Sequence, residues 1–137
     1  MKPGTPILLI EDDLVDVMTV KRALRELKMT NPLRVASNGE EGLASLRSEN
    51  QCAPGLILLD LNMPRMNGLE FLQVVKADDQ LRRLPVVVLT TSAQANDRLE
   101  SFNLGIAGYI IKPVDFTNFV EVMRSIQDYW SHCEAAP

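Results

Sequence analysis

The sequence predicts a doubly wound α/β fold, in which a five-stranded parallel sheet of order 2-1-3-4-5 carries helices on both faces. Five short apolar runs alternate with helix-like segments along the 137 residues, and right-handed crossovers then favour parallel strands. The run 56–59 has no polar alternation and ends at Asp60, as expected of a strand buried on both faces. The order 2-1-3-4-5 suits five strands, with its switch point between strands one and three.

The first two strands are expected at 7–10 and 33–36. Between them, an amphipathic helix runs to about Lys28 and carries one apolar face at helical spacing. That face consists of Val17, Val20, Leu24 and Leu27. After the second strand, Asn38 caps a helix, and Glu41 stands at its third position in a capping-box arrangement. The buried side of this helix consists of Leu43 and Leu46.

Three further strands are expected, each followed by a helix. Asn67-Gly68 marks a loop after the third strand, with a helix over about 69–76, and Gly105 ends the helix at about 95–103. The last helix starts behind Asp115 and runs to about Trp130. The strands themselves lie at 56–59, 85–89 and 109–111.

Composition favours a single soluble domain over 1–137, with a core from about 6 to 131. Hydrophobic residues make up 46% and charged residues 23%, while the net charge of −4 gives no basic footprint for nucleic acid. No apolar run approaches the roughly 20 residues that span a membrane, and no signal-peptide core precedes the first strand. Cys52 and Cys133 do not form a metal-binding spacing. We therefore expect a cytoplasmic protein that acts neither on nucleic acid nor in a membrane.

The predicted sheet brings five polar residues to one edge. Glu11 and Asp12 follow the first strand, Asp60 follows the third, and Thr90 and Lys112 end the last two. Clustered carboxylates repel one another unless a cation neutralises them, and hard oxygen ligands suit Mg²⁺ (or Mn²⁺). A carboxylate among a metal, an ammonium and a hydroxyl can attack a phosphoryl group. Two plainer interpretations remain: Asp60 caps the next helix, or the residues form a structural ion cluster around the lysine.

These residues, in this order, resemble the receiver domain of two-component response regulators, including the chemotaxis receivers. The resemblance covers Ile7 to about Tyr129 and implies a flavodoxin-like fold. It rests on Glu11-Asp12, Asp60-Leu61-Asn62-Met63-Pro64, Asn67-Gly68, Thr90 and Lys112-Pro113. It implies that Asp60 is the phosphoacceptor and that Lys112 and Thr90 contact the phosphoryl oxygens. It also implies metal ligation by Asp12, Asp60 and the Asn62 backbone carbonyl, with Glu11 helping through water.

The resemblance further implies that Thr90 and Tyr109 form a switch, and that the Lys112-Pro113 bond is cis. It implies a signalling protein rather than an enzyme, without an output domain. Thr91 departs from the smaller residue usual in the family. The chain also resembles the single-domain regulators that partner phytochrome kinases. This narrower resemblance rests on the Thr90-Thr91-Ser92 run, the short chain and the Tyr129-Trp130 ending.

The phosphoryl donor is expected to be a separate protein. His132 is the only histidine, and its place in the tail favours a solvated residue. The resemblance therefore implies a sensor histidine kinase, of phytochrome type, or a phosphotransfer protein.

Two other functional classes were compared with this interpretation. A phosphohydrolase of the haloacid dehalogenase type would carry a second aspartate two residues after the nucleophile, where this chain has Asn62. A flavin mononucleotide carrier of the same strand order would need a hydroxyl- and glycine-rich loop after the first strand, where Glu11-Asp12-Asp13 would repel phosphate. Turnover of p-nitrophenyl phosphate and a yellow colour on purification would identify them.

The last helix also predicts an interaction surface. Its core stripe recurs at three- and four-residue steps, whereas Val122 and Tyr129 share a different face. With Tyr109 on the neighbouring strand, they suggest an apolar patch. We expect a two-fold homodimer through the fourth helix, the fifth strand and the last helix. The core stripe consists of Phe116, Phe119, Val120, Met123, Ile126 and Trp130.

Overall fold

The protein is described from a computed structural model, which covers residues 4–112 and 115–131. Five parallel strands pair in the order β2-β1-β3-β4-β5, which confirms the predicted topology. The strands are β1 Ile7–Ile10, β2 Leu33–Ala36, β3 Leu56–Leu59, β4 Val86–Thr90 and β5 Gly108–Ile111. The helices are α1 Leu14–Glu26, α2 Gly39–Arg47, α3 Gly68–Ala77, α4 Ala95–Asn103 and α5 Phe116–Ser131.

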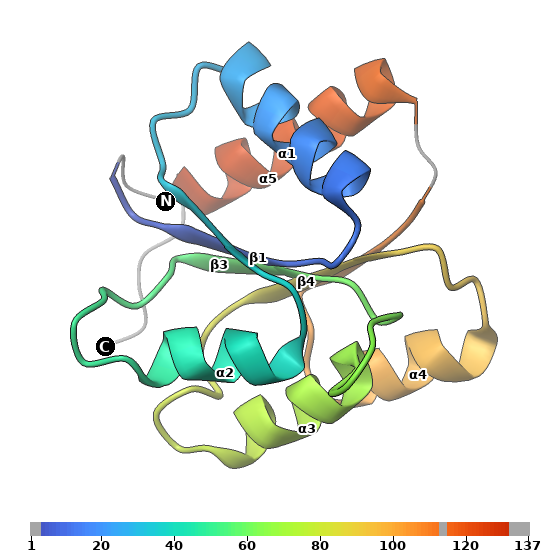
Figure 1. Ribbon diagram of the computed structural model, residues 1–137. Helices are drawn as coiled ribbons and strands as arrows, with labels where there is room; N and C mark the ends of the chain where they lie inside the picture. Colours follow the sequence, from blue (N-terminus) through green and yellow to red (C-terminus); the bar gives the residue numbers. More distant parts are fainter. Residues whose placement is uncertain (1–3, 113–114, 132–137) are drawn as a thin grey trace.

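Helices cover both faces of the sheet (Figure 1). α1 and α5 pack together on one face, while α2, α3 and α4 lie on the other. Alternate strand residues therefore enter two separate cores. On β1, Ile7 and Leu9 face α1 and α5, whereas Leu8 and Ile10 face α2 and α3. This two-sided burial explains why the strands show no polar alternation.

The predicted core stripes are confirmed where the structure describes them. Phe119, Val120 and Met123 of α5 are buried, and Phe116 and Ile126 pack against the same core. On α1, Val17, Val20 and Leu24 are buried against this core, with Leu27 partly buried beside them. The Trp130 side chain, the Lys112-Pro113 bond, His132 and Cys133 lie outside the described residues. Within the described part of the chain, no helix is long and apolar enough to cross a membrane.

Two helix boundaries differ from the prediction. α1 ends at Glu26, because Lys28 adopts a left-handed backbone conformation with φ 55. α3 begins at Gly68, where Asn67 and Glu70 form a complete capping box. Glu70 N donates to Asn67 Oδ1 at 2.9 Å, and Asn67 N donates to Glu70 Oε1 at 3.2 Å. Asn67 and Gly68, which were expected in a loop, are therefore the N-cap and the first residue of α3.

The predicted cap of α2 is present in part. Asn38 Oδ1 accepts a hydrogen bond from Glu41 N at 2.9 Å, as expected of an N-cap. The Glu41 carboxylate accepts instead from Ser37 N, one residue before the cap, at 3.2 Å. The two hydrogen bonds together connect the first turn of α2 to the residues that follow β2. Leu43 is buried as predicted, and Leu46 packs against the core from a partly buried position.

Candidate phosphoacceptor and metal site

Asp60 lies directly after β3 at the carboxyl edge of the sheet. It is 7% exposed, and its backbone N–H donates to Ile10 O of the neighbouring strand at 3.1 Å. Its Oδ1 accepts from Asn62 N at 3.2 Å. The start of α3 presses against this segment, since a Cβ on Gly68 would come within 2.5 Å of Asp60 O. Glycine is therefore required at position 68 for the close approach that fixes the Asp60 backbone.

Three carboxylates converge at this point. Glu11, Asp12 and Asp60 each offer an oxygen, and these oxygens lie within 4.8 Å of one another. Glu11 is buried and Asp12 is exposed, so the cluster is open on one side. One buried oxygen, Glu11 Oε2, has no hydrogen-bond partner among the described residues. Leaving such an oxygen dry and unpaired is costly, and a bound cation would satisfy it.

Lys112 supplies the positive charge of the site from the end of β5. Its Nζ donates to Glu11 Oε1 at 2.5 Å and to Asp16 Oδ2 at 2.6 Å. The same nitrogen lies 3.9 Å from Asp60 Oδ2. The ammonium therefore lies near Asp60 but is bonded more closely to Glu11 and Asp16.

The pKa shifts follow from this crowding. Burial, and next the neighbouring Asp60 carboxylate, raise the pKa of Glu11 from 4.5 to about 9, although Lys112 acts in the opposite direction. Burial alone would lower the pKa of Lys112, but its bonds to Asp16 and Glu11 outweigh burial and raise that pKa. For Asp16, burial alone would raise the pKa, but the hydrogen bond from Lys112 outweighs burial and lowers that pKa below its usual value.

Thr90 ends β4, and Asn62 lies in the loop that follows Asp60. Thr90 is fully buried, and its Oγ1 accepts from Ser92 N at 3.3 Å. The Asn62 amide reaches across from the loop after β3, donating to Thr91 Oγ1 at 3.2 Å and to Thr90 Oγ1 at 3.5 Å. The unusual Thr91 thus has a structural partner, because its bond to Asn62 connects the end of β4 to the loop that follows Asp60.

Tyr109 connects this side of the site to the surface. Its hydroxyl donates to Ser92 O at 2.9 Å, and its ring lies 6.5 Å from that of Phe102 on α4. The ring is half-buried and packs against the core. A short series of contacts therefore runs from Thr90 through Ser92 to Tyr109.

Asp16 is the site residue that the sequence analysis missed. It follows Asp12 by four residues and lies in the first turn of α1. An aspartate there usually complements the helix dipole, so its position alone carries no functional signal. Only the packing of α1 against α5 and the sheet brings it to Lys112. The other predicted residues, Glu11, Asp12, Asp60, Asn62, Thr90 and Lys112, are all brought to the same edge of the sheet.

Comparison with known proteins agrees with this geometry. The response regulator receiver domain family model matches residues 7–124. Rcp1 of Synechocystis, a response regulator, is 33% identical over 98% of this chain and 95% of its own, and its Mn²⁺-bound crystal structure superposes with a TM-score of 0.85. The phosphorylated cyanobacterial phytochrome response regulator RcpA is 33% identical, with a TM-score of 0.87 and coverage of 98% and 99%.

The similarity extends beyond phytochrome regulators. A probable methanogenesis regulatory protein, FilR2 of Methanothrix harundinacea, is also 33% identical, over 96% of this chain and 86% of its own. The family match covers the sheet, the acidic edge and most of α5. The chain therefore belongs to the response regulator receiver domain family.

Proposed function

We propose that this protein is a two-component response regulator that accepts a phosphoryl group on Asp60 in a Mg²⁺-dependent reaction. The observation that carries the proposal is a buried acceptor carboxylate flanked by two further carboxylates and an ammonium. Such a group is costly to bury unless a cation compensates it, which points to function rather than to stability.

The residues fit a divalent metal. Asp12 and Asp60 would bind the ion with the Asn62 backbone carbonyl, and Glu11 would act through water. The unpartnered Glu11 Oε2 and the exposed side of the cluster support this assignment. Oxygen ligands with room for water suit Mg²⁺ or Mn²⁺. The metal would neutralise charge on the phosphoryl oxygens and on the acceptor.

The chain's own residues would supply the rest of the chemistry. An Asp60 carboxylate oxygen forms the new bond to phosphorus. At the same time the bond between phosphorus and the donor breaks, and the electron pair of that bond leaves with the donor. Lys112 donates to the phosphoryl oxygens from the β5 side. Thr90 Oγ1 accepts its bonds from Ser92 N and Asn62, so its hydroxyl hydrogen can be donated to the phosphoryl group.

The same residues suggest how the signal leaves the site. When Thr90 turns toward the phosphoryl oxygens, Tyr109 moves into the space that it vacates, giving two discrete packings. The bonds between Thr90 and Ser92, and between Ser92 and Tyr109, support this connection. Identical Tyr109 rotamers in the metal-only and beryllofluoride-bound forms would contradict it.

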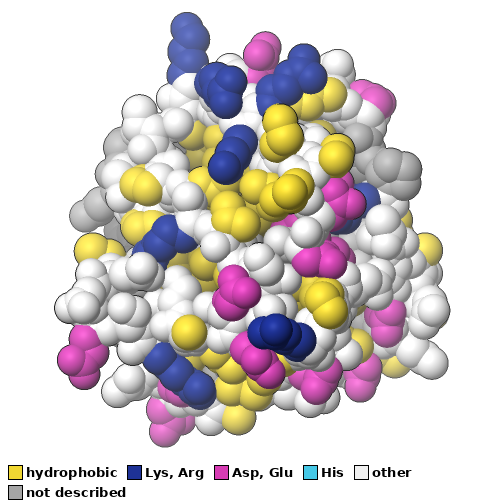
Figure 2. All heavy atoms as spheres, viewed as in Figure 1, with side chains coloured by type: hydrophobic (Ala, Val, Ile, Leu, Met, Phe, Trp, Pro, Cys, Tyr) yellow, Lys and Arg dark blue, Asp and Glu magenta, His cyan; other side chains and the backbone are white. Residues whose placement is uncertain are grey.

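A sensor histidine kinase, of phytochrome type, is the proposed donor. The first turns of α1 expose three large apolar side chains beside the acidic edge, an arrangement suited to a docking protein. Figure 2 shows hydrophobic side chains at the surface near acidic ones on this face of the molecule. The likeness to RcpA supports a phytochrome kinase, and phosphotransfer profiling against such kinases would test this choice. The apolar residues are Leu14, Val15 and Met18.

The central test is labelling of the acceptor. Asp60→Asn should abolish incorporation of phosphate from acetyl phosphate with Mg²⁺, since an amide cannot form the acyl phosphate. Asp79→Asn removes an exposed carboxylate far from the cluster and should label like the wild type. Intact-mass spectrometry detects the adduct. Full labelling of Asp60→Asn would overturn the assignment.

A further inference from the structure

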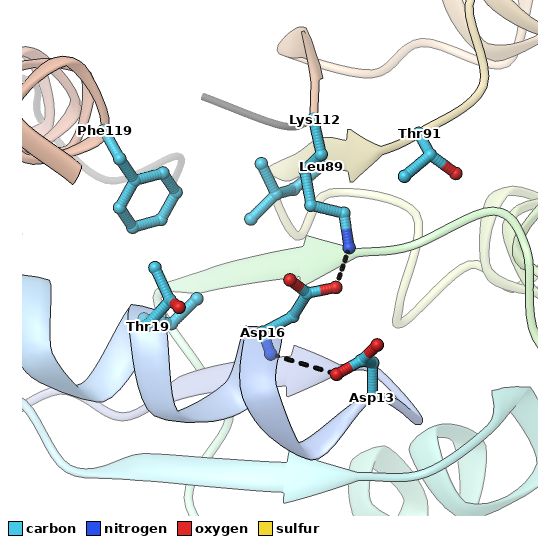
Figure 3. Close-up of a pocket in the computed structure, with 8 residues that line it drawn as sticks. Asp13, Asp16, Thr19, Leu89, Thr91, Lys112 and Phe119 are labelled. Atoms are coloured by element: carbon cyan, nitrogen blue, oxygen red, sulfur yellow. Dashed lines mark hydrogen bonds and ion pairs between the residues drawn. The ribbon is translucent and has the colours of Figure 1, made fainter. Parts of the chain in front are cut away.

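The Asp16 carboxylate points at the ammonium of Lys112, and both side chains line the same cavity (Figure 3). The cavity has a volume of about 470 Å³ and is lined by α1, α5 and the ends of β4 and β5. Lys112 Nζ lies 2.6 Å from Asp16 Oδ2, but 3.9 Å from Asp60 Oδ2. The ammonium is thus drawn toward α1 and away from the acceptor.

The contact is more than a solvated surface pair. The Lys112 side chain is 11% exposed and that of Asp16 is 34% exposed, so water only partly screens the charges. Asp16 is also held in place, because its backbone N–H donates to Asp13 Oδ1 in the first turn of α1. A short, charge-assisted bond between positioned groups is stronger than a neutral one.

Asp16 and a phosphoryl group on Asp60 would compete for the position of the Lys112 ammonium, not for its number of donors. The ammonium has three N–H groups, and Glu11 and Asp16 occupy two of them. To bond a phosphoryl oxygen on Asp60, the nitrogen must approach that oxygen to about 2.8 Å. The 2.6 Å bond to Asp16 opposes such a movement of the ammonium toward Asp60, from which it now lies 3.9 Å away.

We propose that Asp16 is a positioning residue that holds Lys112 back from the acceptor and weakens phosphoryl binding until their contact is released. The inference rests on the proposed function, in which Asp60 is the acceptor. Asp16 acts only through Lys112. Its effect must therefore disappear when the ammonium is removed.

The test uses the full chain and beryllofluoride, a phosphoryl mimic, titrated calorimetrically at saturating Mg²⁺. Asp16→Asn keeps the shape of the side chain and removes its charge, and should tighten beryllofluoride binding several-fold. Asp13→Asn is the matched control: it removes a neighbouring charge, and asparagine caps α1 equally well. Its beryllofluoride affinity should stay within about twofold of the wild type, since Asp13 does not contact Lys112.

A second arm separates positioning from a structural role. In a Lys112→Met background, Asp16→Asn should no longer change beryllofluoride affinity, as a double-mutant cycle measures. Equal affinities for Asp16→Asn and Asp13→Asn, weaker binding by Asp16→Asn, or an effect that persists without Lys112 would each overturn the inference. A wild type that binds no beryllofluoride and does not label at Asp60 would overturn the proposed function as well.

Discussion

The central and edge strands of the sheet differ in how firmly they hold the residues at their carboxyl ends. Every residue of β1, β3 and β4 is buried, whereas one residue of β2 and none of β5 is buried. Glu11 and Asp60 follow central strands, while Tyr109 belongs to the edge strand β5 and Lys112 follows it directly. A packed interior resists displacement, so the carboxylates are fixed at the proposed metal site.

The difference suggests a division of labour within one site. The central strands provide a preorganised set of carboxylates, which lowers the cost of binding a cation. The edge strand provides the ammonium and the aromatic ring, to which we assign movement. Three measurements would break or sharpen this comparison.

The largest expected effect is on the pH dependence of stability of the metal-free protein. Burial raises the pKa of Glu11 from 4.5 to about 9, so the folded state binds its proton more tightly than the unfolded state. This contribution to stability is complete below about pH 4.5 and is lost as the pH rises to about 9. Over that window Glu11 should remove roughly 1 kcal/mol of unfolding free energy per pH unit.

Denaturant titrations of the wild type and Glu11→Gln at several pH values measure the effect. Only the wild type should lose stability in this way, because the amide does not titrate. Asp16 has a lowered pKa and Lys112 a raised one, so their contributions change at acid and strongly alkaline pH, outside this window. Saturating Mg²⁺ should flatten the decline. If the unfolding free energies of the wild type and Glu11→Gln change with pH in the same way, the pKa of Glu11 is not raised in the folded protein.

The two carboxylates after β1 should differ in their effect on metal binding. Asp12→Ala should weaken Mg²⁺ binding by about tenfold, or roughly 1.4 kcal/mol, because Asp12 is the proposed direct ligand. Glu11→Ala should cost less, since one Glu11 oxygen already bonds Lys112. Calorimetry at one fixed pH compares them, with Asp13→Asn as the charge control. Equal or reversed losses would mean that the two roles are exchanged.

Much of the fold and the site could be predicted from sequence, because the strands carry strong local signals. Uninterrupted apolar runs mark strands buried on both faces, and the crossover rule leaves few strand orders. Once the order is fixed, Glu11, Asp60 and Lys112 must meet at one edge. The prediction succeeded because this meeting depends on topology rather than on side-chain detail.

The partners of Lys112 could not be predicted in the same way. The sequence placed its ammonium at Asp60, whereas the structure shows shorter bonds to Glu11 and Asp16. Which face Asp16 takes depends on the rotation of α1, and Val17, Val20 and Leu24 set that rotation by packing against the sheet. Long-range packing of this kind leaves no local pattern at residue 16.

The smallest expected effect concerns self-association through the edge. We propose that two copies pair through α4, β5 and α5. Of the three residues that the sequence suggested for this surface, Tyr129 of α5 is exposed, whereas Tyr109 and Val122 are only half-buried. The other exposed large apolar side chains on these elements are Leu99 and Phe102 of α4 and Ile111 of β5.

Tyr129→Asp should weaken this dimer several-fold, because it places two like charges near the two-fold axis of the dimer. The effect is limited because the surface is exposed and salt partly screens the charges. Tyr129 is 63% exposed, so the substitution should leave the fold intact. Tyr129→Phe keeps the ring and serves as the control. Light scattering at about 10–50 µM, with and without beryllofluoride, measures the association. If the edge strand transmits phosphorylation, beryllofluoride should strengthen the wild-type dimer and have less effect on Tyr129→Asp. A wild type that remains monomeric in both conditions would exclude the dimer and leave this apolar surface to a different protein.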